Sequence, residues 1–112
     1  MPPLGNSGYT TGRILVVDDQ AANVRVVSTL LARNGYEVIP AGSGPEALAA
    51  AGAQKPDLIL LDMMMPGMDG FELLAALRAQ PTLRDVPAVF LTAAHDRDLL
   101  LRAFEAGAVD YV

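Results

Sequence analysis

The sequence has no cysteine and no tryptophan, a single lysine, and no long apolar run. Without cysteine it forms neither disulfides nor thiolate metal sites, which fits a reducing, cytoplasmic location. No apolar run approaches the roughly 20 residues that a membrane-spanning helix requires, so we expect no membrane association. The net charge of −5 provides no basic stripe for phosphates, so we expect no direct nucleic-acid partner.

The composition that remains is that of one folded domain. Apolar residues make up 52% of the 112 residues, enough for a single hydrophobic core. Residues 1–12 lack the basic and apolar regions of a signal peptide, and we expect them to form a flexible leader. The folded domain is expected to span residues 13–112.

Short apolar runs alternate with helical patterns along this domain. The apolar runs are Ile14–Val17, Val38–Ile39, Leu58–Leu61, Val86–Leu91 and Val109–Val112. Runs of this kind are typical of parallel strands that are buried on both faces. The order βαβαβαβαβ therefore predicts an α/β fold, a doubly wound flavodoxin-like parallel sheet of five strands.

The helices between these runs carry recognisable start and stop signals. Apolar residues recur at helical spacing from Val24 to Leu31, and Gly35 follows as a stop. Ser43 and Glu46 have the spacing of a capping box for the second helix. A third helix, capped at Asp69, should bury Phe71, Leu74 and Leu77, and a fourth should span residues 96–106.

Acidic side chains stand at the ends of two of the apolar runs. Asp18 and Asp19 follow the first run, Asp62 follows the third, and Thr92 follows the fourth. Ligands of open parallel sheets bind beyond the carboxyl ends of the strands, so these groups should meet at one edge. Mutual repulsion should raise the pKa of at least one carboxyl. Mg²⁺ is the cation that suits such a group best, and a carboxylate there can attack phosphorus.

Four separated motifs resemble the receiver domain of bacterial two-component response regulators. They are Arg13–Asp19, Leu60–Gly70, Leu91–Ala93 and Ala106–Tyr111, in that order. The resemblance covers nearly everything from Arg13 onward. It implies that Asp62 accepts a phosphoryl group, that Asp19 binds Mg²⁺ directly, that Asp18 binds it largely through water, and that the Met64 backbone carbonyl is another ligand.

The resemblance also implies a switch and a set of partners. Thr92 would be the hydroxyl that hydrogen-bonds the phosphoryl group, and Tyr111 the aromatic that rotates inward with it. A histidine kinase or phosphotransfer protein would be the donor, and an output domain or partner protein, with a possible homodimer, would receive the signal. Such a domain is no enzyme in the usual sense, although it assists its own phosphorylation and dephosphorylation.

The chain departs from the family pattern at its last residues. The family has a lysine and a proline shortly after the aromatic, whereas this sequence stops at Val112. Lys55 precedes the third strand, at the opposite end of the sheet, and cannot substitute. We therefore expect a receiver truncated in or just after the fifth strand, with the last helix missing and the sheet face near Ile14–Val17 uncovered.

The sequence is also compatible with other interpretations. The main alternative is a pseudo-receiver that is never phosphorylated and acts as a protein-interaction module. A phosphohydrolase with an aspartyl nucleophile would be expected to have an acid at Gln20, and an FMN-binding module would have a phosphate loop after the first strand. Asp18 and Asp19 could simply cap a helix, and the methionines of the loop after Asp62 could simply pack.

Two further residues near the expected site are given no role. Asn23 is expected on the exposed start of the first helix, and His95 in a solvated loop.

In the family, the side chains two places after the phosphoacceptor and two after the switch hydroxyl help to align water. Here these are Met64 and Ala94, neither of which holds a water by hydrogen bonding, so slow loss of the phosphoryl group is expected.

Overall fold

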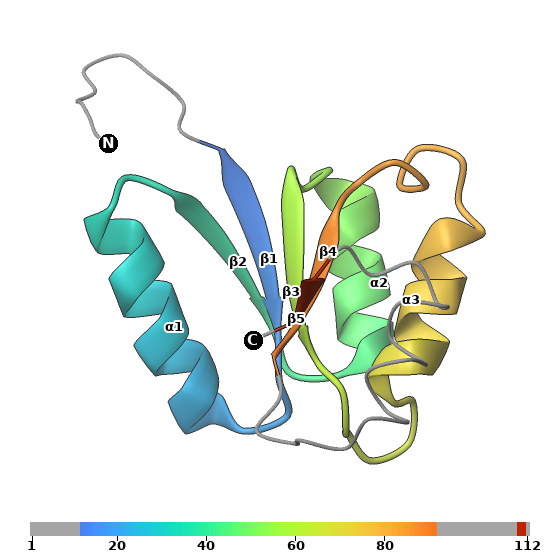
Figure 1. Ribbon diagram of the computed structural model, residues 1–112, viewed down its shortest axis with the longest axis horizontal. Coiled ribbons are helices and arrows are strands. Elements are labelled where there is room, and N and C mark those ends of the chain that lie inside the picture. The colour runs from blue at the N-terminus through green and yellow to red at the C-terminus, as the bar shows by residue number, and fades with distance from the viewer. Residues whose placement is uncertain (1–11, 92–109, 112) are drawn as a thin grey trace.

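The computed structural model describes residues 12–91 and 110–111, which form a single parallel sheet with helices on both faces (Figure 1). The elements are β1 (Arg13–Val17), α1 (Ala21–Arg33), β2 (Glu37–Ala41), α2 (Gly44–Ala53), β3 (Leu58–Asp62), α3 (Gly70–Arg78), β4 (Ala88–Leu91) and β5 (Asp110–Tyr111). The strand order is β2-β1-β3-β4-β5, and every pair is parallel. This confirms the predicted fold class. The helix expected at residues 96–106 lies outside the described residues.

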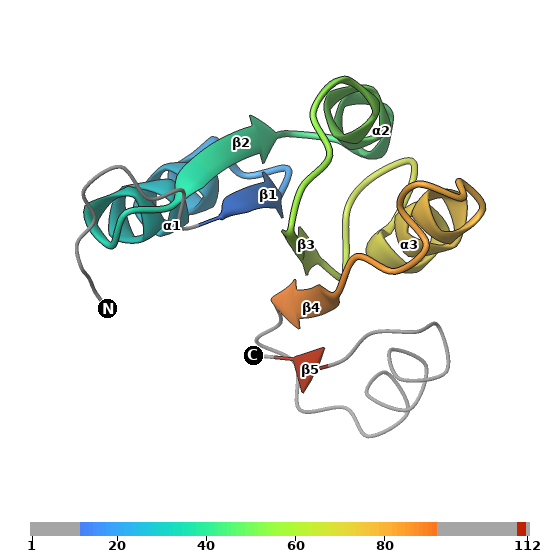
Figure 2. The same ribbon diagram turned by 90° about the horizontal axis from the view of Figure 1, so that it is seen from above.

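The helices divide between the two faces of the sheet. α1 packs against β1 and β2 on one face, while α2 and α3 lie side by side on the other (Figure 1, Figure 2). Within the described residues, the crossovers from β1 to β2, from β2 to β3 and from β3 to β4 carry α1, α2 and α3. The chain reverses its direction of travel across the sheet between β1 and β3. The acidic residues lie at the carboxyl ends of these two strands, where ligands of such sheets bind.

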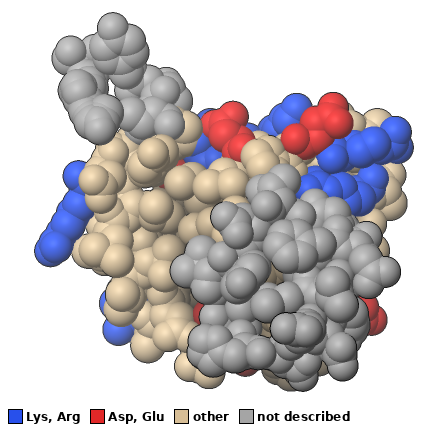
Figure 3. Space-filling view, in the orientation of Figure 1, with Lys and Arg blue, Asp and Glu red and all other residues tan. Residues whose placement is uncertain are grey.

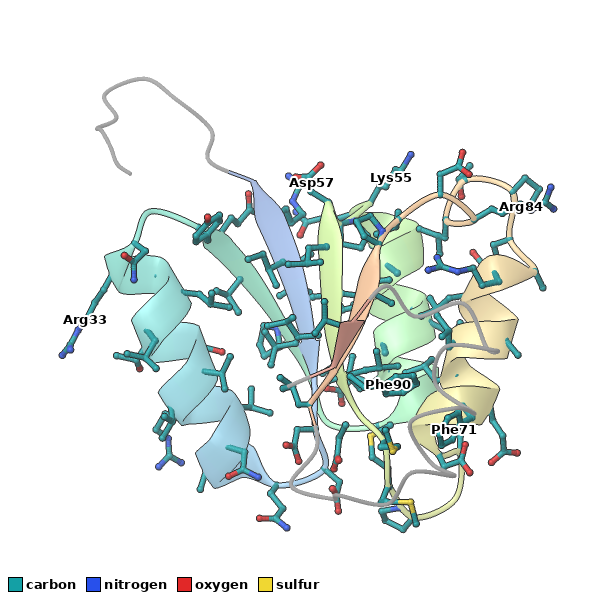
Figure 4. The ribbon with its side chains drawn as sticks, in the orientation of Figure 1. Arg33, Lys55, Asp57, Phe71, Arg84 and Phe90 are labelled. Carbon is teal, nitrogen blue, oxygen red and sulfur yellow. The ribbon has the colours of Figure 1, made fainter. Side chains whose placement is uncertain are left out.

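The main core lies between the sheet and the pair α2 and α3. Alternate residues of β1, β3 and β4 point into it, together with the inner faces of the two helices: Leu15, Val17, Ile59, Leu61, Ala88, Phe90, Ala47, Ala51, Leu73, Leu74 and Leu77. The rings of Phe71 and Phe90 meet with their centroids 5.1 Å apart (Figure 4). The stripe predicted for α3 is confirmed, and Leu73 widens it because this helix is also covered by α2.

The face covered by α1 is less completely buried. The expectation that the sheet face near Ile14–Val17 would be uncovered is wrong, since Ile14 is 4% exposed and Val16 is fully buried. On this face β3 and β4 are only half-buried, because α1 packs against β1 and β2 instead. α1 itself buries no residue completely, and its Val26 and Leu30 are 61% and 54% exposed.

Two of the helix starts form as their sequence signals predict. Ser43 accepts a hydrogen bond from the backbone N–H of Glu46, and the Glu46 carboxylate in turn accepts from the N–H of Gly42. The second bond of this box therefore reaches one residue further back than the usual pattern. Asp69 and Glu72 form a complete capping box at the start of α3.

The amino ends of the strands carry a separate cluster of charged groups. The Arg13 guanidinium pairs with Glu37 at 3.1 Å and donates to the carbonyl of Lys55, while the Arg13 backbone N–H donates to Asp57. Acidic and basic side chains mix along this edge (Figure 3), where Lys55 and Asp57 project (Figure 4). Lys55 thus lies at the end of the sheet opposite Asp62, as expected. None of the helices in the described ranges has the length and apolarity of a membrane span.

Candidate functional site

Strand register brings the acidic residues together at the carboxyl edge of the sheet. Val17 of β1 is level with Leu61 of β3, so Asp18 and Asp62 are the next residues on neighbouring strands. One oxygen each from Asp18, Asp19 and Asp62 lies within 4.8 Å of the others. The predicted grouping of three carboxylates is therefore present in the structure.

Asp18 is the buried member of the group, with 6% of its surface exposed. Its Oδ1 accepts the backbone N–H of Gln20 at 2.9 Å, and its Oδ2 accepts the side-chain amide of Asn23 at 3.2 Å. Its own N–H donates to the carbonyl of Ala41 on β2. A buried charge needs such partners, and here they also fix the direction in which the carboxylate points.

The alternative in which Asp18 and Asp19 merely cap a helix is not what the structure contains. The residue at the N-cap of α1 is Gln20, and no side chain caps the helix there. Asp18 does bond a backbone N–H at this turn, but through an interaction with the residue two positions on. Asp19 is exposed, and one of its carboxylate oxygens lies near those of Asp18 and Asp62.

Asp62 is half-buried at the end of β3, and its pKa is raised above the ordinary value. Burial is the largest cause; the charges of Asp18 and Asp19 add to it, as does a hydrogen bond that protonated Asp62 can make to Asp19. A hydrogen bond from the Met64 N–H to Asp62 Oδ1, 3.3 Å long, acts in the opposite direction. The direction agrees with the predicted rise in pKa, but burial is its largest single cause, ahead of the repulsion from either Asp18 or Asp19.

The loop after Asp62 is held by its apolar side chains. Met63 and Met65 are buried, and Met68 packs against the same core, so packing is their role. Met64 is the exception, with 65% of its surface exposed beside Asp62. Gly67 has a φ of +79°, which with the preceding proline is the arrangement of a type II turn. The loop closes where the Gly70 N–H donates to the carbonyl of Met63 at 3.1 Å.

The three carboxylates fit a hard divalent cation. Their donor atoms are all oxygen, lie close enough to share one ion, and come from rigid strand ends. Among the described residues, the Met64 N–H is the one group that lowers the pKa of Asp62, and no basic side chain adds to it. A divalent ion would remove the repulsion between the carboxylates, and Mg²⁺ is the ion for which one or two carboxylates plus a phosphate suffice.

A groove opens from the acidic group toward α1 and β2. It has a volume of about 510 Å³ and runs between the first turns of α1 and the start of α2. Its lining combines the two aspartates with apolar walls and with Arg25 and Glu46: Asp18, Asp19, Ala21, Val24, Arg25, Ser28, Pro40, Ala41, Gly42 and Glu46.

The structure places the expected switch residues only in part. Leu91 is level with Asp62 in the sheet, and Thr92 is the next residue, but Thr92 and His95 lie outside the described residues. The backbone of Tyr111 lies in β5, level with Phe90 of β4. The residue that the sequence interpretation missed is Asn23. Asn23 follows Asp19 by four residues, about one helical turn, and this spacing was the sequence signal that could have indicated its role.

A family model and two curated relatives all describe response regulators. A family model described as the response regulator receiver domain matches residues 14–112. Response regulator PleD of Caulobacter vibrioides is 48% identical over 102 residues, which are 91% of this chain and 22% of that protein. DNA-binding response regulator MtrA of Mycobacterium tuberculosis is 41% identical over 100 residues, which are 89% of this chain and 42% of that protein. The chain thus spans less than half the length of either relative.

Solved structures show the same fold. Chemotaxis protein CheY4 of Vibrio cholerae has a TM-score of 0.86 and 35% identity, over 89% of this chain and 83% of that one. The N-terminal domain of a response regulator receiver protein from Methanoculleus marisnigri has a TM-score of 0.84 and 41% identity, over 92% and 84%. The Mn²⁺-bound form of response regulator Rcp1 has a TM-score of 0.79 and 33% identity, over 90% and 79%.

Proposed function

The chain belongs to the response regulator receiver family, and on this premise we propose that Asp62 is the residue that accepts the phosphoryl group. The observation that carries the proposal is the meeting of Asp62 with Asp18 and Asp19 at the carboxyl edge of the sheet. The donor would be a histidine kinase or a phosphotransfer protein. The receiver of the signal would be an output domain or partner protein, a second copy of the chain included.

The geometry around Asp62 favours one of its two oxygens as the nucleophile. Oδ1 is held by the Met64 N–H, so we take Oδ2 as the oxygen that attacks phosphorus. As the new P–O bond to Oδ2 forms, the P–N bond to the donor histidine breaks, and the imidazole leaves. The protein's part in such a transfer is mainly positioning and neutralisation of charge.

We propose that Asp18, Asp19, Asp62 and the backbone carbonyl of Met64 hold a divalent ion, with Mg²⁺ as the natural choice. The Mn²⁺-bound form of the similar regulator Rcp1 supports this proposal, as does the shared oxygen donor set. When bound, the ion would supply positive charge to the carboxylates and to the phosphoryl oxygens. The chain's own contribution is to hold these oxygens in place.

The switch is proposed to follow phosphorylation at Asp62. Thr92 would hydrogen-bond the phosphoryl group, and Tyr111 would respond to the movement of Thr92. The support is positional, since Thr92 directly follows Leu91, which is level with Asp62, and Tyr111 lies on the neighbouring strand. The alternative of a pseudo-receiver that is never phosphorylated is not favoured by any feature of the described residues, which bring all three acidic groups together.

The proposal is tested by phosphorylation with a small donor. The purified protein is incubated with acetyl phosphate and Mg²⁺, and its intact mass should increase by one phosphoryl group. Asp62→Asn should abolish the increase, and EDTA should suppress it. The matched control is Asp57→Asn, just before the other end of the same strand (Figure 4), where the carboxylate accepts the Arg13 N–H. Phosphorylation that persists in Asp62→Asn would refute the assignment.

A further inference from the structure

Among the described residues, Asn23 is the one whose side-chain amide donates a hydrogen bond to the acidic group. Its amide nitrogen donates to Asp18 Oδ2 at 3.2 Å and lies 3.4 Å from the side-chain oxygen of Gln20. Its backbone N–H donates to the carbonyl of Gln20 at 3.0 Å, so the first turn of α1 holds the residue in place. The helix thus holds the backbone of Asn23, and the side-chain amide points at the Asp18 carboxylate.

A carboxylate with only one partner is free to turn about its last side-chain bond, since this torsion has broad, shallow minima. The Gln20 N–H holds Asp18 Oδ1, and the Asn23 amide holds Oδ2. Each oxygen of a carboxylate can accept two hydrogen bonds, so each keeps one lone pair for another ligand. The two donors together leave Asp18 oriented but not saturated.

The chemical type of the partner matters as much as its position. An amide donates a hydrogen bond without carrying charge, so it orients the carboxylate and leaves its negative charge for a cation. A lysine or arginine at the same place would form an ion pair with Asp18 and compete with that cation. Hydrogen-bond partners of metal ligands generally fix ligand orientation, and their loss weakens metal binding.

We propose that Asn23 is a positioning residue that holds the Asp18 carboxylate in the direction required for the divalent ion. The inference rests on the proposed function, because it concerns the same ion. Asn23 acts through Asp18 and does not touch the phosphoryl group itself. The role is specific to this side chain: Asn34, near the other end of α1, donates its amide to the carbonyl of Leu30, far from the acidic group.

The test is a direct measurement of Mg²⁺ affinity by isothermal titration calorimetry, without phosphoryl transfer. Asn23→Ala should weaken binding several-fold, up to about tenfold, the lower end of the range for outer partners of metal ligands. In an Asp18→Ala background the same substitution should cause no further loss, because its target is gone. The control Asn34→Ala should leave the affinity unchanged.

Asn23→Lys is a second variant that keeps a polar side chain at this exposed position and so provides an independent test. It should weaken Mg²⁺ binding more than Asn23→Ala does, because the ammonium group pairs with Asp18. Wild-type affinity in Asn23→Ala or Asn23→Lys overturns the inference, as does an equal loss with and without Asp18. If the unsubstituted protein binds no Mg²⁺, the proposed metal site fails first and the role of Asn23 falls with it.

Discussion

Gly70 lies so close to Asp62 that a Cβ atom added to the glycine would overlap the Asp62 carbonyl oxygen. The same Cβ would lie 2.9 Å from the ring of Phe90 and 3.0 Å from the Cα of Met63. The start of α3 is therefore pressed against the end of β3. This close approach sets the position of the loop that carries Met64.

The first prediction concerns this contact. Gly70→Ala should lower the free energy of unfolding by about 3 kcal/mol, at the upper end of the range for overpacking, because two of the three atoms in the way are backbone. Chemical denaturation measures the change. Gly52→Ala is the control, since nothing lies within 4 Å of its added Cβ. In helix α2 it should stabilise by about 0.5–1 kcal/mol. Equal stability of the two variants would contradict the close packing.

The raised pKa of Asp62 predicts a pH-dependent effect of Asp62→Asn on stability. Because the pKa lies above its ordinary value of 3.8, the folded state holds the proton more tightly than the unfolded state. The favourable contribution is complete below about pH 3.8 and is lost as the pH rises through the raised pKa. In EDTA, Asp62→Asn should melt above wild type at neutral pH, and the difference should shrink in acid. A difference that grows in acid would be the opposite of this expectation.

The exposed Met64 predicts a long-lived phosphoryl group. Its side chain is 65% exposed beside Asp62, and a thioether is too weak an acceptor to hold an attacking water. Met64→Asn should speed hydrolysis, measured as the loss of the phosphoryl group from purified phosphoprotein with time. Met64→Leu, which keeps an apolar side chain of similar size, should leave the rate unchanged. No change, or slower hydrolysis, in the asparagine variant would count against the argument.

The three carboxylates should contribute unequally to Mg²⁺ binding. Asp19 is exposed to solvent, whereas Asp18 is buried and both of its oxygens already accept hydrogen bonds. Calorimetry should therefore show a larger loss of affinity in Asp19→Ala than in Asp18→Ala, and a smaller loss still in Asn23→Ala. Equal affinity in wild type and Asp19→Ala would show that the ion binds elsewhere.

Much of the site follows from the sequence, because strand register is simple in a parallel sheet. Apolar runs that end in aspartate place their carboxylates at one edge, and this requires no knowledge of side-chain packing. The grouping of Asp18, Asp19 and Asp62 was predictable for that reason. The N-caps at Ser43 and Asp69 were predictable as well, since their hydrogen bonds are local.

The remaining features depend on packing that periodicity does not reveal. Asn23 is exposed, and its role appears only once the turn after β1 brings its amide to Asp18. The burial of Leu73 requires α2 beside α3, which is a tertiary contact. Burial is the largest single cause of the raised pKa of Asp62, and a count of charges in the sequence could not show this.

The most direct test of the account is to locate the phosphoryl group. After phosphorylation with acetyl phosphate and Mg²⁺, borohydride reduces an aspartyl phosphate to homoserine, and mass spectrometry of the peptides identifies the altered residue. The account predicts homoserine at Asp62 alone, and none when EDTA is present during phosphorylation. Homoserine at another aspartate, or a phosphoryl group that borohydride does not convert, would contradict it.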